Sequence, residues 1–122
     1  MAKILIVDDN QVSHQILRVL LERDNHEVAS VFNGQEAIEK LDHTNIDLVI
    51  TDVNMPVMDG IELLKWIRKD QRFIETPVIV LTASGKSKMP EIASREGATG
   101  FLTQPFSSWE LNQLVNSCLP MR

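Results

Sequence analysis

Three carboxylates and one hydroxyl stand at or just after the ends of short apolar runs: Asp8, Asp9, Asp52 and Thr82. If those runs are parallel strands, the side chains that follow them gather at the edge where α/β sheets bind ligands. Converging carboxylates repel one another, which raises the proton affinity of at least one of them. A divalent cation relieves that repulsion, and an open rim with few oxygen ligands suits Mg²⁺. The set therefore predicts phosphoryl transfer onto an aspartate, assisted by a metal and a hydroxyl donor.

Five short, mostly apolar runs must act as the strands that position these groups. They are Ile4–Val7, Val28–Val31, Leu48–Ile50, Val78–Leu81 and Gly100–Leu102. Most are apolar at successive positions, which is typical of strands covered on both faces. They alternate with helical segments, so the pattern predicts a parallel sheet with helices on both sides.

The segments between the runs carry apolar residues at helical spacing, and we expect these residues to face the core. In chain order they are Val12, Ile16, Val19 and Leu20; Ala37, Ile38 and Leu41; Ile61, Leu64 and Ile67; Ile92 and Ala93; and Leu111, Leu114, Val115 and Cys118. The fourth segment, from about Met89 to Glu96, is weakly amphipathic. Asn33 and Asp59 precede helical segments, and Ser107 or Ser108 is placed to cap the last one.

Length and composition describe one small acidic domain. The chain has 122 residues, of which 12 are Lys or Arg and 17 are Asp or Glu, for a net charge of −5. That charge gives no reason to expect direct nucleic-acid binding. No apolar run approaches the roughly 20 residues of a membrane-spanning helix, and no signal peptide is apparent. A single cysteine, Cys118, fits a reducing compartment, so we expect a cytoplasmic domain without a membrane partner.

Four motifs resemble those of response-regulator receiver domains, including the chemotaxis regulators. They are Ile4–Asp9, Asp52–Gly60, Leu81–Ala83 and Gly97–Phe106, in the family's order and approximate spacing. The resemblance covers residues 1–122 and implies a flavodoxin-like α/β fold: one domain, five helices and a doubly wound five-stranded parallel sheet of order 2-1-3-4-5. The last helical segment ends at Leu119 and Pro120, so we expect no output domain in this chain.

The resemblance further implies roles in two-component signalling for the three clustered aspartates and for Asn54. Asp52 would be phosphorylated by a histidine kinase or phosphotransfer protein. Asp9 and Asp52 would bind Mg²⁺ through their carboxylates, Asn54 through its backbone carbonyl, and Asp8 mainly through bound water. The domain would be a phosphoprotein rather than an enzyme, because it only assists phosphoryl transfer to, and hydrolysis from, its own Asp52.

Two further residues would connect phosphorylation to a partner. Thr82 would donate a hydrogen bond to the phosphoryl group and move toward it, and the ring of Phe101 would then turn inward. The face made by the fourth helix, fifth strand and fifth helix would present this change to a downstream output protein. We expect a monomer or a weak dimer.

Gln104 departs from the family pattern, which places a lysine immediately before Pro105. An amide donates a hydrogen bond but carries no positive charge, and charge-assisted hydrogen bonds contribute roughly 1.5–3 kcal/mol against about 1 kcal/mol for neutral ones. We therefore expect stronger repulsion among the acids, greater dependence on the metal and a weaker switch. The resemblance also implies a cis Gln104–Pro105 peptide bond.

Other interpretations of the same residues remain open. A degenerate receiver that binds partners without phosphorylation is the main alternative, and Gln104 is its support. An aspartate-nucleophile phosphatase is disfavoured, because such enzymes need a second acid where Asn54 stands. Asp8 and Asp9 could instead cap the first helix, and Met55–Met58 could be a docking contact or loop packing.

The remaining notable side chains have simpler interpretations. The histidines, at positions 14, 26 and 43, lack metal-ligand spacing and are predicted to lie on the surface. Cys118 is interpreted as a core thiol. Trp109 is either a packed edge residue or a partner contact, and Lys86 and Lys88 are interpreted as solvated lysines near the rim.

Overall fold

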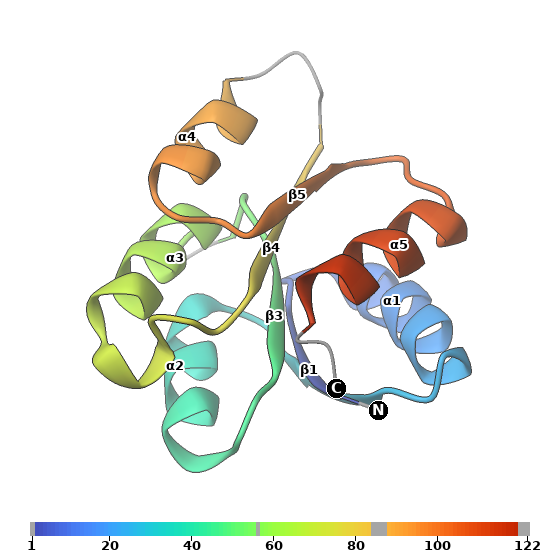
Figure 1. Cartoon of the computed structure of the whole chain (residues 1–122), viewed down its shortest axis with the longest axis horizontal. Helices are drawn as coiled ribbons and strands as arrows, with labels where there is room; N and C mark the ends of the chain where they lie inside the picture. The colour runs from blue at the N-terminus through green and yellow to red at the C-terminus, as the bar shows by residue number, and fades with distance from the viewer. Residues whose placement is uncertain (1, 56, 84–87, 120–122) are drawn as a thin grey trace.

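One parallel sheet organises the chain in the computed structural model, which describes residues 2–55, 57–83 and 88–119. Its strands are β1 (Lys3–Val7), β2 (Glu27–Val31), β3 (Leu48–Asp52), β4 (Val78–Thr82) and β5 (Gly100–Thr103). They lie in the order β2-β1-β3-β4-β5, and every neighbouring pair is parallel. The predicted doubly wound sheet of order 2-1-3-4-5 is confirmed (Figure 1).

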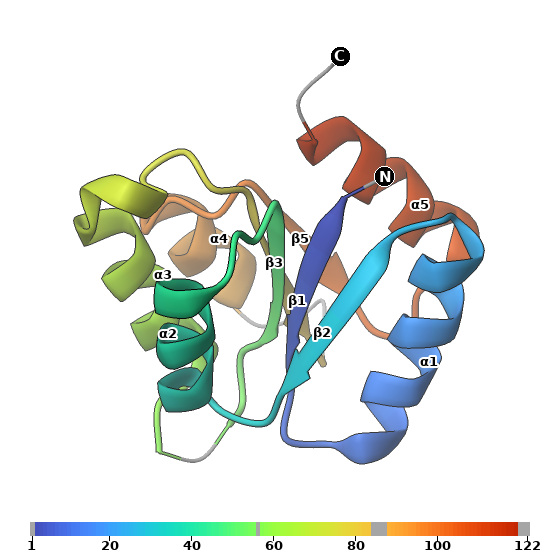
Figure 2. The same ribbon diagram turned by 90° about the horizontal axis from the view of Figure 1, so that it is seen from below.

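Five helices cover the two faces of this sheet. They are α1 (Gln11–Arg23), α2 (Gly34–His43), α3 (Gly60–Lys69), α4 (Met89–Arg95) and α5 (Ser108–Cys118), with a short 3₁₀ turn, η1 (Gln71–Phe73), after α3. Figure 2 shows α1 and α5 on one face and α2, α3 and α4 on the other. Within the described ranges, none of these helices is long and apolar enough to span a bilayer.

The core has two halves because both faces of the sheet are covered. Along β1, Leu5 and Val7 pack on the side of α2, α3 and α4, whereas Ile4 and Ile6 pack on the side of α1 and α5. All four side chains have no solvent exposure. Burial on both faces is the reason that the strand sequences are apolar at consecutive positions.

Side-chain caps fix where the helices begin. Asn10, rather than Asp8 or Asp9, caps α1, and its Oδ1 accepts hydrogen bonds from the amides of Val12 and Ser13. Asn33 caps α2, Asp59 and Glu62 form a capping box on α3, and Ser107 and Glu110 form another on α5. The predicted cap on the last helix is confirmed at Ser107. Asn33 and Asp59, expected only to precede helices, also cap them, and Asp8 and Asp9 are left available for another role.

The predicted apolar face of α1 is wrong for three of its four residues, whereas Leu20 is partly buried and packs against the core. Val12, Ile16 and Val19 are exposed by 62%, 53% and 62%. The buried face instead carries residues 14, 17 and 21, namely His14, Leu17 and Leu21. Both sets of residues have helical spacing. The buried set contains a polar histidine, so its sequence does not indicate the face that packs on the sheet.

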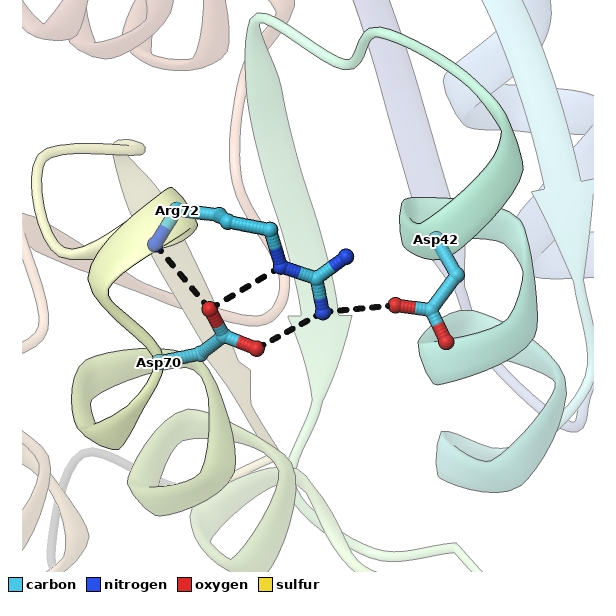
Figure 3. A network of polar contacts seen from close by, with 3 residues as sticks. All are labelled: Asp42, Asp70 and Arg72. Atoms are coloured by element: carbon cyan, nitrogen blue, oxygen red, sulfur yellow. Dashed lines mark hydrogen bonds and ion pairs between the residues drawn. The ribbon is translucent and has the colours of Figure 1, made fainter.

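A surface network connects η1 to α2 (Figure 3). Nη2 of Arg72 lies 2.8 Å from Oδ1 of Asp42 and 2.8 Å from Oδ2 of Asp70. The hydrogen bonds and charges of these two carboxylates raise the pKa of Arg72. Because these ion pairs are solvent-exposed, they order the turn after α3 and add little to stability.

A pair of alanine substitutions tests the observed setting of α1. Leu17→Ala should lower the free energy of unfolding by about 2–4 kcal/mol, because it opens a cavity at a buried position. Ile16→Ala should change that free energy by about 0.5 kcal/mol or less, since Ile16 is exposed. Urea unfolding of both variants measures the difference, and equal losses would contradict the observed helix setting.

Candidate functional site

The ends of β1 and β3 bring the three carboxylates together. These strands are neighbours, and Val7 pairs with Thr51, so Asp8 and Asp52 leave the sheet side by side. Carboxylate oxygens of Asp8, Asp9 and Asp52 all lie within 4.8 Å of one another. The predicted convergence on one rim is confirmed, and this spacing allows all three to face a single cation.

Backbone hydrogen bonds hold the first acid in place. The amide of Asp8 donates to the carbonyl of Val31 at 3.2 Å, and its Oδ1 accepts from the amide of Asn10 at 2.9 Å. Its side chain is buried, whereas Asp9 beside it is exposed. The pair therefore offers one fixed carboxylate and one that solvent reaches.

The charge at this rim is incompletely compensated. The pKa of Asp52 is raised to about 6, chiefly by burial and next by the negative charge of Asp8. Hydrogen bonds from the amides of Asn54 and Val53 oppose this change, and the charge of Asp9 adds to it. Burial also raises the pKa of Asp8, against the hydrogen bond from the amide of Asn10. Such a site is suited to a cation, which stabilises the ionised carboxylates.

The loop after β3 turns back sharply beneath Asp52. The amide of Gly60 donates to the carbonyl of Val53 at 2.9 Å, so α3 begins directly beside the strand end. A side chain at residue 60 would place its Cβ 2.2 Å from the Asp52 carbonyl oxygen, so only glycine fits there. Within the loop, Asn54 is exposed, and Val57 is 80% exposed with a φ of 71°, which is strained for a β-branched residue.

The apolar loop that contains Val57 has mixed surroundings. Met55 and Met58 are partly buried and pack against the core on the side of α2 and α3. Loop packing is therefore confirmed for these two residues, while Val57 presents its side chain to solvent. Pro56 lies outside the described residues.

Thr82 and Gln104 complete the rim from β4 and β5. The side chain of Thr82 is 2% exposed, and within the described ranges its hydroxyl oxygen has no hydrogen-bond partner. The amide of Gln104 donates to the carbonyl of Thr82 at 2.8 Å, which places Gln104 at the same rim. The Gln104–Pro105 bond is cis, as predicted. A buried hydroxyl that lacks a partner is suited to an oxygen-rich ligand.

Aromatic side chains lie outward on the neighbouring face. Phe101, on β5, is 45% exposed, and Trp109, on α5, is 69% exposed. Together with Leu114 they line a shallow hollow of about 420 Å³. The interpretation of Trp109 as a packed edge residue is therefore wrong, and the two aromatic rings form an accessible surface.

The prediction of surface histidines is wrong for His14 and holds for His43. His14 is 4% exposed, and its Nε2 lies 2.5 Å from the carbonyl oxygen of Asp8. His26 is half-buried, with its Nδ1 3.2 Å from the amide of Ala2, and His43 is exposed. The sequence signal for His14 is its spacing from Leu17 and Leu21, which places all three on one helical face.

The cysteine and the lysine near the rim lie in different environments. Cys118 is half-buried on α5, packs against the core on that side, and has its pKa raised by burial. Lys88 is exposed where α4 begins, and Lys86 lies outside the described residues. The interpretation of Lys88 as a solvated lysine therefore agrees with its position.

Comparison with protein families resolves what kind of domain carries this rim. Residues 4–116 match the response regulator receiver domain. This chain belongs to the response regulator receiver family. Two curated relatives from Bacillus subtilis (strain 168) are the transcriptional regulatory protein ResD, 38% identical over 117 residues, and the alkaline phosphatase synthesis regulator PhoP, 35% identical over 117 residues. Each alignment covers 96% of this chain and 48% of the relative, so the receiver domain spans about half the length of these relatives.

Solved structures share the fold as well as the sequence. Chemotaxis response regulator CheY4 of Vibrio cholerae superposes with a TM-score of 0.91 and 34% identity, covering 98% of this chain and 99% of that one. The signal receiver domain of a histidine kinase from Syntrophus aciditrophicus gives a TM-score of 0.91 and 34% identity, covering 98% and 90%. The receiver domain is therefore a signalling domain of the two-component type.

The raised pKa of Asp52 predicts a pH-dependent effect of its neutral analogue. Between its usual value of 3.8 and about 6, Asp52 binds more protons in the folded metal-free protein than in the unfolded chain. Stability from this group therefore falls as the pH rises through that window. After a discount for partial exposure, Asp52→Asn should stabilise the metal-free receiver domain by about 1–2 kcal/mol at pH 7.5 and much less at pH 4.

Urea unfolding in EDTA across this pH range measures that difference. A gain from Asp52→Asn that is the same at pH 4 and at pH 7.5 would contradict the electrostatic cause. Asp47→Asn serves as the control, because Asp47 precedes β3 at the opposite end of the strand and accepts a hydrogen bond from the amide of Lys3.

Proposed function

We propose that this receiver domain accepts a phosphoryl group on Asp52 from the phosphohistidine of a histidine kinase or phosphotransfer protein, with Mg²⁺ at the rim. The observation that carries the proposal is the grouping of three carboxylates within 4.8 Å. The hydroxyl of Thr82 at the same rim, which has no hydrogen-bond partner among the described residues, adds a donor for the incoming group. Membership of the receiver family supports the same chemistry.

The donor set fits a magnesium ion. Carboxylate and carbonyl oxygens are the hard ligands that Mg²⁺ prefers, and an open rim leaves room for its waters. We assign the carboxylates of Asp9 and Asp52 and the backbone carbonyl of Asn54 as direct ligands, with Asp8 acting mainly through water. Bound there, Mg²⁺ would offset negative charge on the phosphoryl oxygens.

Asp52 is the nucleophile in this proposal. One of its carboxylate oxygens attacks phosphorus while the bond from phosphorus to the donor's imidazole nitrogen breaks. The electron pair of that bond leaves with the imidazole, which takes up a proton. The backbone of Asn54 and of Val53 lowers the pKa of Asp52, which favours the ionised carboxylate that attacks. The hydroxyl of Thr82 donates to a phosphoryl oxygen.

We infer that the signal leaves the site through Thr82 and Phe101. Phe101 on β5 pairs with Val80 on β4. Thr82 lies two residues beyond Val80 on the same strand, so Thr82 and Phe101 are near each other in the sheet. Movement of Thr82 toward a phosphoryl group would make room for the exposed ring of Phe101 to turn inward. This movement would change the face of α4, β5 and α5, which carries Trp109. The changed face would then bind a downstream output protein.

Gln104 sets this receiver domain apart from the family pattern. Its amide can donate to the phosphoryl group but adds no positive charge, so the bound group is held less strongly than by a charge-assisted hydrogen bond. We therefore propose a switch that depends more on the metal. The same residue supports the second candidate function, a receiver that binds its partner without phosphorylation.

Intact-mass spectrometry separates the two candidates. Incubation with a small-molecule phosphodonor and Mg²⁺ should add one phosphoryl group to the wild type. The same treatment should add none to Asp52→Asn, which lacks the nucleophile, and none to the wild type in EDTA. A folded wild-type protein that forms no adduct would contradict phosphorylation on Asp52 and favour the interaction module.

A further inference from the structure

We propose that His14 is a positioning residue for the metal site: its imidazole holds the peptide unit that joins Asp8 to Asp9. This inference rests on the function proposed above, since it concerns the same carboxylates. It assigns a purpose to a buried polar side chain that packs on the same face of α1 as Leu17 and Leu21.

The contact with Asp8 indicates which ring nitrogen of His14 carries a hydrogen. Nε2 of His14 lies 2.5 Å from the carbonyl oxygen of Asp8, and a carbonyl oxygen can only accept a hydrogen bond. Nε2 therefore carries the hydrogen and donates. Nδ1 is buried, and within the described ranges it has no hydrogen-bond partner. A purely apolar side chain would avoid the cost of burying that nitrogen, so the useful part of His14 is its Nε2 donor.

The accepting carbonyl belongs to the peptide plane between the two acids. Because that unit is planar, fixing the direction of the Asp8 carbonyl also fixes the amide of Asp9 and constrains both Cα atoms. The amide of Asp8 is bound to Val31, and its carboxylate is bound to the amide of Asn10. The hydrogen bond from His14 adds a constraint on the carbonyl side of Asp8, next to the peptide bond that leads to Asp9.

The imidazole itself is held by the loop after β2. Its ring centroid lies 4.6 Å from that of Phe32, with the planes tilted by 59°. The backbone of Phe32 is held in turn, because its amide donates to Oε1 of Glu36 at 2.7 Å, while its ring is 44% exposed. The histidine is thus clamped between this loop and the metal-binding segment. Groups that hydrogen-bond metal ligands directly change metal affinity by about 10–100-fold when mutated. His14 acts through the backbone beside the ligands, so we expect an effect at the lower end of that range.

A matched pair of variants tests the role. His14→Leu fills the site without a donor, whereas His14→Gln keeps an amide donor at a similar reach. We expect His14→Leu to weaken Mg²⁺ binding about 10-fold, and His14→Gln to bind Mg²⁺ nearly as tightly as the wild type. Calorimetric titration with Mg²⁺ measures the affinity, and urea unfolding in EDTA measures stability separately.

The two measurements distinguish positioning from simple packing. The buried Nδ1 has no hydrogen-bond partner in the part of the chain that the structure describes, so its removal offsets the loss of one hydrogen bond. The stability of His14→Leu should therefore stay close to that of the wild type while its Mg²⁺ affinity falls. An affinity equal to that of the wild type in His14→Leu would overturn the role of His14 alone. A wild-type protein that does not bind Mg²⁺ would overturn the proposed function as well.

A spectroscopic test needs no variant. In a Mg²⁺ titration followed by imidazole ¹⁵N NMR, the signals of His14 should shift and should show hydrogen on Nε2. His26 and His43 are internal controls, because His26 contacts Ala2 at the opposite end of the sheet and His43 ends α2. Signals of His14 that stay unchanged while Mg²⁺ binds, or that show hydrogen on Nδ1, would overturn the proposal.

Discussion

Repulsion among three carboxylates within 4.8 Å of one another is the constraint on which the rest of this structure depends. Parallel strands end at a common rim, so Asp8 and Asp52 cannot separate without disturbing β1 and β3. Those strands are buried on both faces and resist such movement. This placement raises the pKa of Asp52, first through burial and next through the charge of Asp8. A divalent cation would relieve the excess of negative charge and would thereby allow an anionic phosphoryl group to bind at the same rim.

The backbone around the rim offsets part of this charge. Helices α1 and α3 both begin beside the acids, capped by Asn10 and Asp59, so the partial positive charge of each helix N-terminus faces the site. The amide of Asn10 donates to the carboxylate of Asp8, and the backbone of Asn54 and of Val53 opposes the rise in the pKa of Asp52. Gly60 allows α3 to start within van der Waals reach of Asp52. In the proposed account His14 belongs to this same set of supports, because its Nε2 holds the carbonyl of Asp8 between the acids.

The fold and the grouping of acids could be predicted because they follow from strong, regular signals. Apolar runs buried on both faces alternate with helical segments, and polar residues at strand ends must share a rim. The setting of α1 could not be predicted, since the stripe through Val12, Ile16 and Val19 is as regular as the buried one and more apolar. The burial of His14 could not be predicted either, because it goes with that helix setting and with a contact to Asp8 that only the folded chain creates. The exposure of Trp109 likewise depends on how α5 packs against β5, which its spacing does not reveal.

Calorimetric titration with Mg²⁺ at pH 7.5 tests most directly whether uncompensated charge controls this site. The wild type is compared with Gln104→Lys, which brings an ammonium to the rim, and with Gln104→Met, a neutral control of similar length. If the excess of negative charge draws the metal, the lysine variant binds Mg²⁺ several-fold more weakly than the other two proteins, which bind alike. Equal affinity in all three proteins would contradict the account.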